Sequence, residues 1–164
     1  MHNISRDHIV YSLDRQHAPV LAIDPGERIV LETWDARSGT INSDADLLLR
    51  PHPVGSNPAT GPIHVRGAEP GDALAVHIEA IDLAPSGFLA VKKGEGLLAA
   101  RAEEFATRIV PIVDGTVHFG DLRFPAHPMV GVIGTAPAGE GISTGYAGSH
   151  GGNMDNKHIG PGAT

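Results

Sequence analysis

The sequence predicts a mainly β fold of sandwich or barrel type, with short strands, many Gly and Pro turns and one amphipathic helix. Short runs of alternating apolar and polar residues indicate strands with one buried face. The 21 Gly and 13 Pro residues are spread along the 164-residue chain, which is typical of frequent turns between strands. A single stretch has the composition of a helix.

The first predicted strands flank a turn. Residues 20–23 are an apolar run. The Asp-Pro-Gly-Glu sequence at 24–27 predicts a turn, because Pro fixes φ and Gly accepts a positive φ. Residues 28–35 alternate and predict a strand that ends near Asp35. In the loop-rich stretch that follows, residues 44–49 favour one short helical turn.

Further strands are expected in the middle of the chain. His52 and Asn57 each precede Pro, which favours an extended backbone at both positions. Residues 63–66 predict a strand, and the Glu-Pro-Gly-Asp sequence at 69–72 predicts a turn. The apolar residues that alternate over 74–78 predict a second strand, whose other face is polar.

The one helix is expected at 96–108, which is rich in Ala, Leu, Glu and Arg and can gather its apolar side chains on one face. After it, residues 108–120 predict a hairpin with the Asp-Gly pair at 114–115 as its two-residue turn. Small apolar residues at 127–138 predict another strand. The Gly-rich stretch 139–155 shows no period, and we expect it to be irregular.

Charge and composition exclude several function classes. The chain has 12 basic and 19 acidic residues and a net charge of −7, which argues against general binding to nucleic acid or anionic lipid. The absence of Cys excludes disulfides, thiolate metal sites and a Cys nucleophile. Because no run of about eighteen apolar residues and no apolar leader are present, we expect a soluble, cytoplasmic protein.

The C-terminal segment 149–164 raises the question of a metal site. It contains His150, Asp155 and His158 in the spacing H-x4-D-x2-H, among several Gly. Imidazole and carboxylate are the ligands that Zn²⁺ or a similar cation accepts when thiols are absent. The spacing alone leaves two readings open, a metal site or a solvated turn rich in Gly, Asn and Asp.

A second motif, Gly-Ile-Ser-Thr-Gly at 141–145, matches the letters of a nucleophile elbow. That motif requires a strand before the Ser and a helix after it. The residues that follow Ser143 are rich in Gly and would begin a helix poorly. We therefore interpret this motif as a Gly-rich turn.

Three separated segments resemble the acetamidase/formamidase family. They are LETWDARSG from Leu31, SNPATGPIHVRGAEPGDALAVHIEAI from Ser56 and PMVGVIGTAPAGEGISTGYAGSHGGNMDNKHIGPGAT from Pro128. GGNMD is the most specific element, and the three segments stand in the order of the family. The resemblance implies a mostly β hydrolase that cleaves formamide or acetamide to the acid and ammonia, commonly as a dimer and with a divalent metal.

The resemblance also implies roles for individual residues. Asp35, His150 and Asp155 are the expected ligands of a divalent metal, with Zn²⁺ preferred and Ca²⁺ as the alternative; His150 stands where other members can carry Asn. Asn153 is expected to donate a hydrogen bond to the oxyanion of the reacting amide. Glu140 is expected to act as general acid and base.

Members of the family are longer than this chain. The resemblance implies that residues 1–164 are the N-terminal part of one acetamidase/formamidase-like domain, incomplete at its C-terminal end and without the family's Gly-Asp-x-His-Ala-Ala motif. We therefore expect a small amide substrate, a homo-oligomer or a complementary C-terminal segment as partner, and unpaired strand edges that expose an apolar patch. Two alternatives stay open: an inactive truncated β domain that serves in interaction or small-ligand binding, and an unrelated β module for sugars or metals.

Overall fold

The computed structural model describes residues 1–49 and 56–164, so the predicted extended backbone at His52 lies outside the described residues. Within the described ranges the chain forms short strands and one 3₁₀ turn. They follow in the order β1 (His2–Ile4), β2 (Ile9–Val10), β3 (Ser12–Leu13), β4 (Leu21–Ile23), β5 (Ile29–Leu31), β6 (Ala59–Thr60), β7 (Ile63–Val65), β8 (Ser86–Val91), η1 (Ala99–Arg101), β9 (Ala106–Val113), β10 (Thr116–Phe119), β11 (Leu122–Pro125), β12 (Val132–Gly134), β13 (Ile142–Ser143), β14 (Ala147–Gly148) and β15 (Gly151–Asn153).

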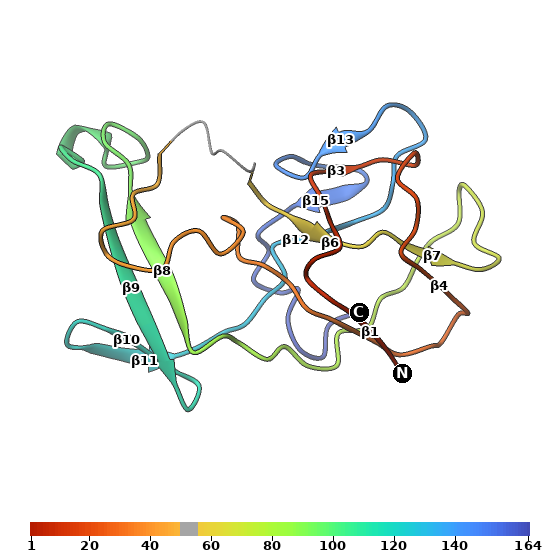
Figure 1. Cartoon of the computed structure of the whole chain (residues 1–164), viewed down its shortest axis with the longest axis horizontal. Coiled ribbons are helices and arrows are strands. Elements are labelled where there is room, and N and C mark those ends of the chain that lie inside the picture. The colour runs from red at the N-terminus through yellow and green to blue at the C-terminus, as the bar shows by residue number, and fades with distance from the viewer. Residues whose placement is uncertain (50–55) are drawn as a thin grey trace.

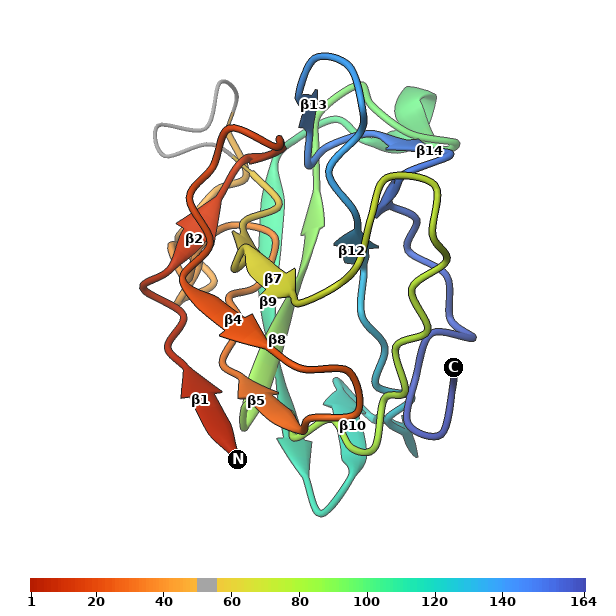
Figure 2. The same ribbon diagram turned by 90° about the vertical axis from the view of Figure 1, so that its right-hand side faces the viewer.

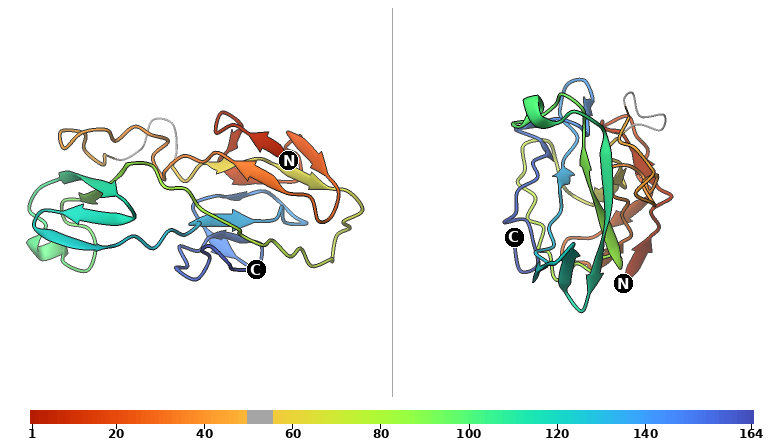
Figure 3. Two further views of the ribbon diagram at one scale, coloured as in Figure 1. Left: turned by 90° about the horizontal axis from the view of Figure 1, so that it is seen from below. Right: turned by 90° about the vertical axis from the view of Figure 1, so that its left-hand side faces the viewer.

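The strands divide into two lobes (Figures 1 and 3). One lobe is an antiparallel sheet with the strand order β11-β10-β9-β8. The other lobe gathers the remaining strands into small sheets, among them the parallel pairs β1–β5 and β4–β7 and the antiparallel sheet β12-β15-β14. Both termini lie in this second lobe (Figure 1).

The mainly β fold is confirmed, but the predicted helix at 96–108 is wrong. Ala99–Arg101 form a single 3₁₀ turn, and Ala106 already belongs to β9, which pairs with β8. Leu97 and Leu98 are exposed, so a helix in this stretch would have no surface to pack on. Because a short helix is marginal without packing, the strand pairing prevails. In the part of the chain that the structure describes, no helix has the length and apolar character to cross a membrane.

The predicted hairpin between β9 and β10 is confirmed. Asp114 and Gly115 have φ values of 47° and 71°, as a type I′ turn requires. The turns expected at 24–27 and 69–72 are also confirmed, by backbone hydrogen bonds of 3.2 and 3.0 Å across them. Local turn chemistry was therefore a reliable guide at these three points.

Other local predictions failed in part. The strand expected at 28–35 is limited to β5. The helical turn expected at 44–49 is absent; a tight turn begins one residue earlier and is closed by a hydrogen bond of 3.1 Å from the Asp46 amide to the Ser43 carbonyl. Asn57 has a φ of 59° and is not extended. The Gly-rich stretch 139–155, expected to be irregular, contains β13, β14 and β15. In the Gly-rich stretch, pairing of β13 with β3 and of β15 with β12 decided the outcome.

A loop covers the part of β9 that extends beyond β10, which pairs only with Ile112 and Val113. The Ile109 amide donates to the Asp44 carboxylate at 2.6 Å, and the Thr107 hydroxyl donates to the Asp46 carbonyl at 2.6 Å. Unpaired groups on a strand edge tend to recruit other strands. At this edge the chain satisfies its own backbone groups.

The segment predicted as a strand at 74–78 is not covered in the same way. It runs beside the C-terminal residues (Figure 2), but residues 72–84 belong to no strand. Between 73 and 84, the backbone hydrogen bonds among the described residues are two: the Ile78 amide donates to the Ala163 carbonyl at 2.9 Å, and the Gly162 amide donates to the Ile78 carbonyl at 2.7 Å. The apolar alternation is present, but the predicted strand at 74–78 is wrong: among residues 1–49 and 56–164 this segment joins no sheet.

The buried core of this chain is small. Four apolar side chains in the described residues are buried, namely Ile4, Ile23, Ile41 and Val110. The accessible surface is 11272 Å², whereas a compact monomer of 17.1 kDa exposes about 7,800 Å². Large apolar side chains are exposed in both lobes, while the predicted apolar patch at unpaired strand edges stays a prediction.

Because the core is small, each buried side chain contributes a large share of the stability. Ile4 is 4% exposed, and we expect Ile4→Ala to lower the free energy of unfolding by about 2 to 5 kcal/mol through lost burial and the cavity left behind. Urea unfolding followed by the fluorescence of Trp34, the single Trp, measures the change.

Val20→Ala is the control, because Val20 is 39% exposed and its truncation should change the free energy of unfolding by less than about 0.5 kcal/mol. Equal unfolding midpoints for the two variants would show that Ile4 is not part of a cooperative core.

Candidate functional site

The Gly-rich segment near the C-terminus forms the central strand of a three-stranded sheet. β15 lies between β12 and β14, with Gly151 opposite Gly134 and Gly152 opposite both Ile133 and Ala147. Gly151 and Gly152 have φ values of 89° and 90°, a region that residues with a Cβ rarely adopt. This backbone path therefore requires glycine at both positions.

The two glycines also allow the neighbouring chains to come close. A Cβ on Gly151 would collide with the carbonyl oxygen of Ile133, and a Cβ on Gly152 would collide with that of Tyr146. The segment is therefore a packed strand rather than a loose solvated turn, and the side chains that flank it are held in place.

His150 immediately precedes this strand and is buried, with 9% of its surface exposed. Its ring packs against the glycines: Nδ1 lies 3.0 Å from the position of a Cβ on Gly148, and Nε2 lies 2.9 Å from that of a Cβ on Gly152. Among the described residues, His150 Nε2 is the single buried side-chain nitrogen or oxygen without a hydrogen-bond partner. A buried polar group without a hydrogen bond costs about 1 to 3 kcal/mol, which makes this nitrogen a candidate to bind a ligand.

Asn153 ends the strand and is fixed at both its backbone and its side chain. Its amide N–H donates to the Tyr146 carbonyl at 3.0 Å, and Nδ2 donates to the Gly145 carbonyl at 3.3 Å. A carboxamide nitrogen carries two N–H donors. One donor positions the side chain, and the second remains for a ligand.

Asp155 lies two residues beyond the strand. Its backbone N–H donates to the Gly131 carbonyl at 3.1 Å, and its φ is 45°. Its carboxylate Oδ1 lies 2.8 Å from the position of a Cβ on Gly131, so the absence of a side chain there makes room for it. The next candidate, His158, is exposed and donates its backbone N–H to the Asn156 side-chain oxygen at 3.0 Å.

Asp35 and Glu140 have different surroundings. The Asp35 carboxylate accepts the backbone N–H groups of Arg37 at 2.6 Å and Gly39 at 3.2 Å, so it holds the turn that follows β5. Glu140 is exposed in the loop before β13. Asp35 thus has an evident structural role, whereas nothing in the structure assigns one to Glu140.

A chain of hydrogen bonds connects the turn of Asp35 with the loop that holds Asn153. The Ser38 and Tyr11 hydroxyls are 2.9 Å apart, and the Tyr11 carbonyl accepts both the backbone N–H and the hydroxyl of Thr144, at 3.0 and 3.2 Å. Gly145, the next residue, accepts from Asn153. Thr144 is fully buried, so this connection is rigid rather than solvated.

Sequence reasoning did not single out Tyr11 or Thr144, because 133 residues separate them and no local pattern joins them. It did interpret Ser143 correctly. Ser143 ends β13 and is followed by a turn that the Tyr146 amide closes at 3.1 Å, so no helix follows it and the motif is not a nucleophile elbow.

The described residues do not by themselves complete a metal site. Within residues 1–49 and 56–164, no three His, Asp or Glu side chains form a group that could hold a metal ion, so Asp35, His150 and Asp155 do not converge as one. The unpaired Nε2 of His150 fits as a nitrogen donor.

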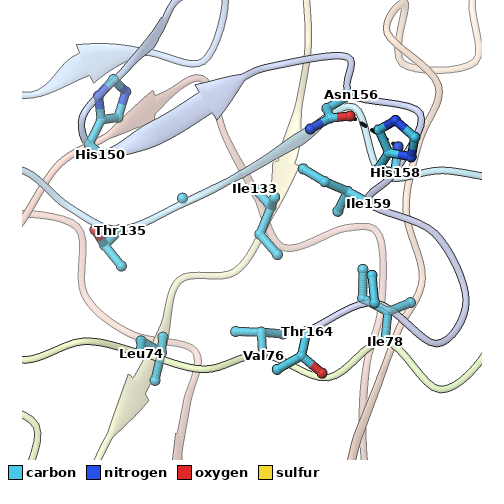
Figure 4. A pocket seen from close by; sticks show the side chains of 12 residues that line it. Leu74, Val76, Ile78, Ile133, Thr135, His150, Asn156, His158, Ile159 and Thr164 are labelled. Carbon is cyan, nitrogen blue, oxygen red and sulfur yellow. Dashed lines mark hydrogen bonds between the residues drawn. The ribbon is translucent and has the colours of Figure 1, made fainter.

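The cavity next to the strand is mostly apolar. It has a volume of about 420 Å³ and is lined by Ile133, His150, Asn156 and Ile159 from the C-terminal region, and by residues of the 74–78 segment. Figure 4 shows the ring of His150 at the border of this cavity, turned away from the apolar side chains. Of the candidate residues, His150 and His158 line this cavity, whereas Asn153 and Asp155 do not.

The packing of β15 can be tested with Gly152→Ala. We expect this variant to lower the free energy of unfolding by about 2 to 5 kcal/mol, because the new methyl group meets the Tyr146 carbonyl and the backbone is strained at a positive φ. Urea unfolding measures the loss.

The matched control is Gly162→Ala. Gly162 has a φ of 86°, and no atom lies within 4 Å of the place that a Cβ would take. The Ala variant should therefore lose only the backbone strain of a left-handed residue, about 1 to 2 kcal/mol. If both variants lost the same free energy, the close packing around Gly152 would be refuted.

Solved structures with the same fold include proteins from three bacteria. An acetamidase of Bacillus halodurans is 36% identical and has a TM-score of 0.93 over 97% of this chain. A protein of Thermoanaerobacter tengcongensis described as a predicted acetamidase/formamidase is 40% identical, with a TM-score of 0.92 over 98% of this chain. An acetamidase of Yersinia enterocolitica is 30% identical, with a TM-score of 0.84 over 98%. The chain spans about half of these proteins, 54%, 54% and 53% of their lengths.

Sequence comparison gives the same result. A protein of Schizosaccharomyces pombe that carries the name of a formamidase is 32% identical over 137 residues, which are 73% of this chain and 32% of that protein. The sequence profile of the acetamidase/formamidase family matches residues 9–144. This match takes in most of the chain, including the turn of Asp35 and Thr144, so the chain belongs to the acetamidase/formamidase family.

Proposed function

We propose that this chain forms one side of the active site of an amidohydrolase, which cleaves small linear amides such as formamide and acetamide to the carboxylate and ammonia. The observation that carries the proposal is the superposition of 97% of the chain, with a TM-score of 0.93, on an acetamidase. Because the chain spans 54% of that protein, the activity is proposed for the assembly with a complementary polypeptide that corresponds to the rest.

Hydrolysis of an amide requires an attacking water, stabilisation of charge on the carbonyl oxygen and a proton for the leaving ammonia. Asn153 suits the second task, because its side chain is positioned by Gly145 and keeps a second N–H donor. One well-placed donor to an oxyanion contributes roughly 3 kcal/mol. Glu140 is the proposed source of the proton, since it is an exposed carboxyl group in the loop before β13.

The proposal includes a divalent cation, Zn²⁺ or alternatively Ca²⁺. When bound, such an ion lowers the pKa of its water to about 7 and polarises the carbonyl group of the substrate. His150 offers an unpaired nitrogen, and Asp35 and Asp155 offer carboxylates. Because these three do not form one ligand group among the described residues, further ligands are proposed to come from the complementary polypeptide.

Cytoplasmic location and a homo-oligomer remain predictions from the sequence.

The incomplete ligand set favours one alternative. Residues 1–164 on their own would then be an inactive β domain that serves in interaction or small-ligand binding. Ammonia release separates this alternative from the amidase, provided that the isolated chain and the assembly are measured side by side.

The first experiment joins residues 1–164 to the part of the Thermoanaerobacter tengcongensis protein that this chain does not span. We expect this chimera to release ammonia from formamide or acetamide, and we expect the isolated chain to release none. Asn153→Ala should lower kcat about 100-fold by removing an oxyanion donor. Asn3→Ala, an exposed residue of β1, is the control and should leave kcat unchanged. A folded chimera without activity on any small amide would refute the amidase.

The second experiment addresses the cation. After equilibration with Zn²⁺, we expect a lower ratio of zinc to protein in the Asp155→Ala chimera than in the parent, because one carboxylate ligand is lost. Asp121→Ala removes an exposed carboxylate from the other lobe and should leave the ratio unchanged. Equal zinc content in all three proteins would remove Asp155 from the ligand set.

A further inference from the structure

Tyr11 lies at the bend between two short strands of the second lobe. Val10, at the end of β2, is opposite Ala59, and Ser12, at the start of β3, is opposite Ser143. Figure 1 shows β3 beside β13, with which it pairs. Because paired strands restrain the backbone on both sides of the bend, the carbonyl and the side chain of Tyr11 have defined positions.

The Tyr11 carbonyl holds the segment that positions Asn153. It accepts the backbone N–H of Thr144 at 3.0 Å and the Thr144 hydroxyl at 3.2 Å. A backbone carbonyl has two lone pairs, so Thr144 uses the whole acceptor capacity of this group. Thr144 is fully buried, and the next residue, Gly145, accepts the side-chain amide of Asn153 at 3.3 Å. The place of the Asn153 carboxamide therefore depends on the bond between Tyr11 and Thr144.

The Tyr11 hydroxyl supports the turn that carries Asp35. It lies 2.9 Å from the Ser38 hydroxyl in a part-buried contact. Ser38 has a φ of 53°, in the left-handed region that is unfavourable for a residue with a Cβ. The Ser38 amide donates to the Asp35 carbonyl at 3.0 Å, and the amide of its neighbour Gly39 donates to the Asp35 carboxylate at 3.2 Å. The bond from Tyr11 thus acts on the residue at which this turn is strained.

We propose that Tyr11 is a positioning residue of the amidase, and that it couples the positions of Asp35 and Asn153. Its hydroxyl holds the Asp35 turn through Ser38, and its carbonyl holds the loop of Asn153 through Thr144. This inference rests on the proposed function, because it takes Asp35 and Asn153 to act on the same substrate. A coupling of this kind is reciprocal, so a change at either end is expected to act on the other.

Amide hydrogen exchange in residues 1–164 tests the coupling independently of catalysis. The reporters are the amides of Gly39 and Asn153, which form hydrogen bonds of 3.2 and 3.0 Å at the two ends of the connection. We expect Thr144→Val to accelerate exchange at Gly39 about tenfold, because the Asp35 turn opens more often once its support is loosened. Ser38→Ala should accelerate exchange at Asn153 by a similar factor, as reciprocity requires.

The matched control is Thr107→Val. Thr107 is also buried, with 8% of its surface exposed, and its hydroxyl donates to the Asp46 carbonyl at 2.6 Å in the other lobe. Both Val variants delete a hydrogen-bonding hydroxyl from a buried Thr, so a general loss of stability would affect them alike. We expect Thr107→Val to leave exchange at Gly39 and Asn153 as in the parent chain. Equal acceleration by Thr107→Val and Thr144→Val would overturn the coupling.

The kinetic experiment uses the chimera with the unspanned part of the Thermoanaerobacter tengcongensis protein. Ser38→Gly removes the hydroxyl, but Gly suits the positive φ at this position, so relief of strain offsets the lost bond. We expect kcat to fall about tenfold while KM stays nearly unchanged, because displaced catalytic groups stabilise the transition state less well. Thr144→Val should have a similar effect, whereas Thr144→Ser keeps the hydroxyl donor and should retain most of kcat.

The double variant Ser38→Gly/Thr144→Val separates a coupled pair from two independent contacts. Since both changes break the same connection, we expect the double variant to lose about tenfold in kcat, as each single variant does. A loss of about 100-fold, the product of the two, would show that the contacts act independently and would overturn the coupling. Thr107→Val in the same chimera should leave kcat unchanged.

The outcomes distinguish this inference from the proposed function. An active chimera in which Ser38→Gly and Thr144→Val leave kcat unchanged would overturn the inference and keep the amidase. Exchange effects confined to the mutated side of Tyr11 would overturn it as well. A folded, inactive chimera would refute the amidase, and reciprocal exchange effects in residues 1–164 would then retain the coupling of the two segments. If the chimera does not fold, the exchange experiment alone decides the coupling.

Discussion

The close approach of three strands at Gly151 and Gly152 is the constraint on which the candidate site depends. Both residues have a positive φ, and both lie against a neighbouring carbonyl group that leaves no room for a side chain. This packing buries His150 on one side of the strand and fixes Asn153 at its end. The geometry of the polar groups thus follows from the absence of two side chains.

The same lobe is held together by contacts between distant parts of the chain. Tyr11 and Thr144 connect the N-terminal strands with the Gly-rich region, and Thr144 is fully buried between them. Polar contacts have this prominent role because the apolar core is small.

The family resemblance rests on segments that the structure brings together. The Asp35 turn and the Gly-rich strand are far apart in sequence, yet hydrogen bonds through Ser38, Tyr11 and Thr144 connect them. The buried His150 nitrogen has no hydrogen-bond partner among the described residues, while Asp35 already holds its own turn. The described residues thus hold these polar groups in place without bringing them together as a ligand set.

The sequence by itself determined the β class, the turns at 24–27, 69–72 and 114–115, and the importance of the Gly-rich segment, because each depends on φ preferences within a few residues. Only the tertiary structure decided that residues 106–108 belong to a strand, that 74–78 joins no sheet of the described residues and that Thr144 is buried against the Tyr11 carbonyl. Those outcomes depend on pairing between segments tens of residues apart. Local preference is weaker than such pairing, so it could not foretell them.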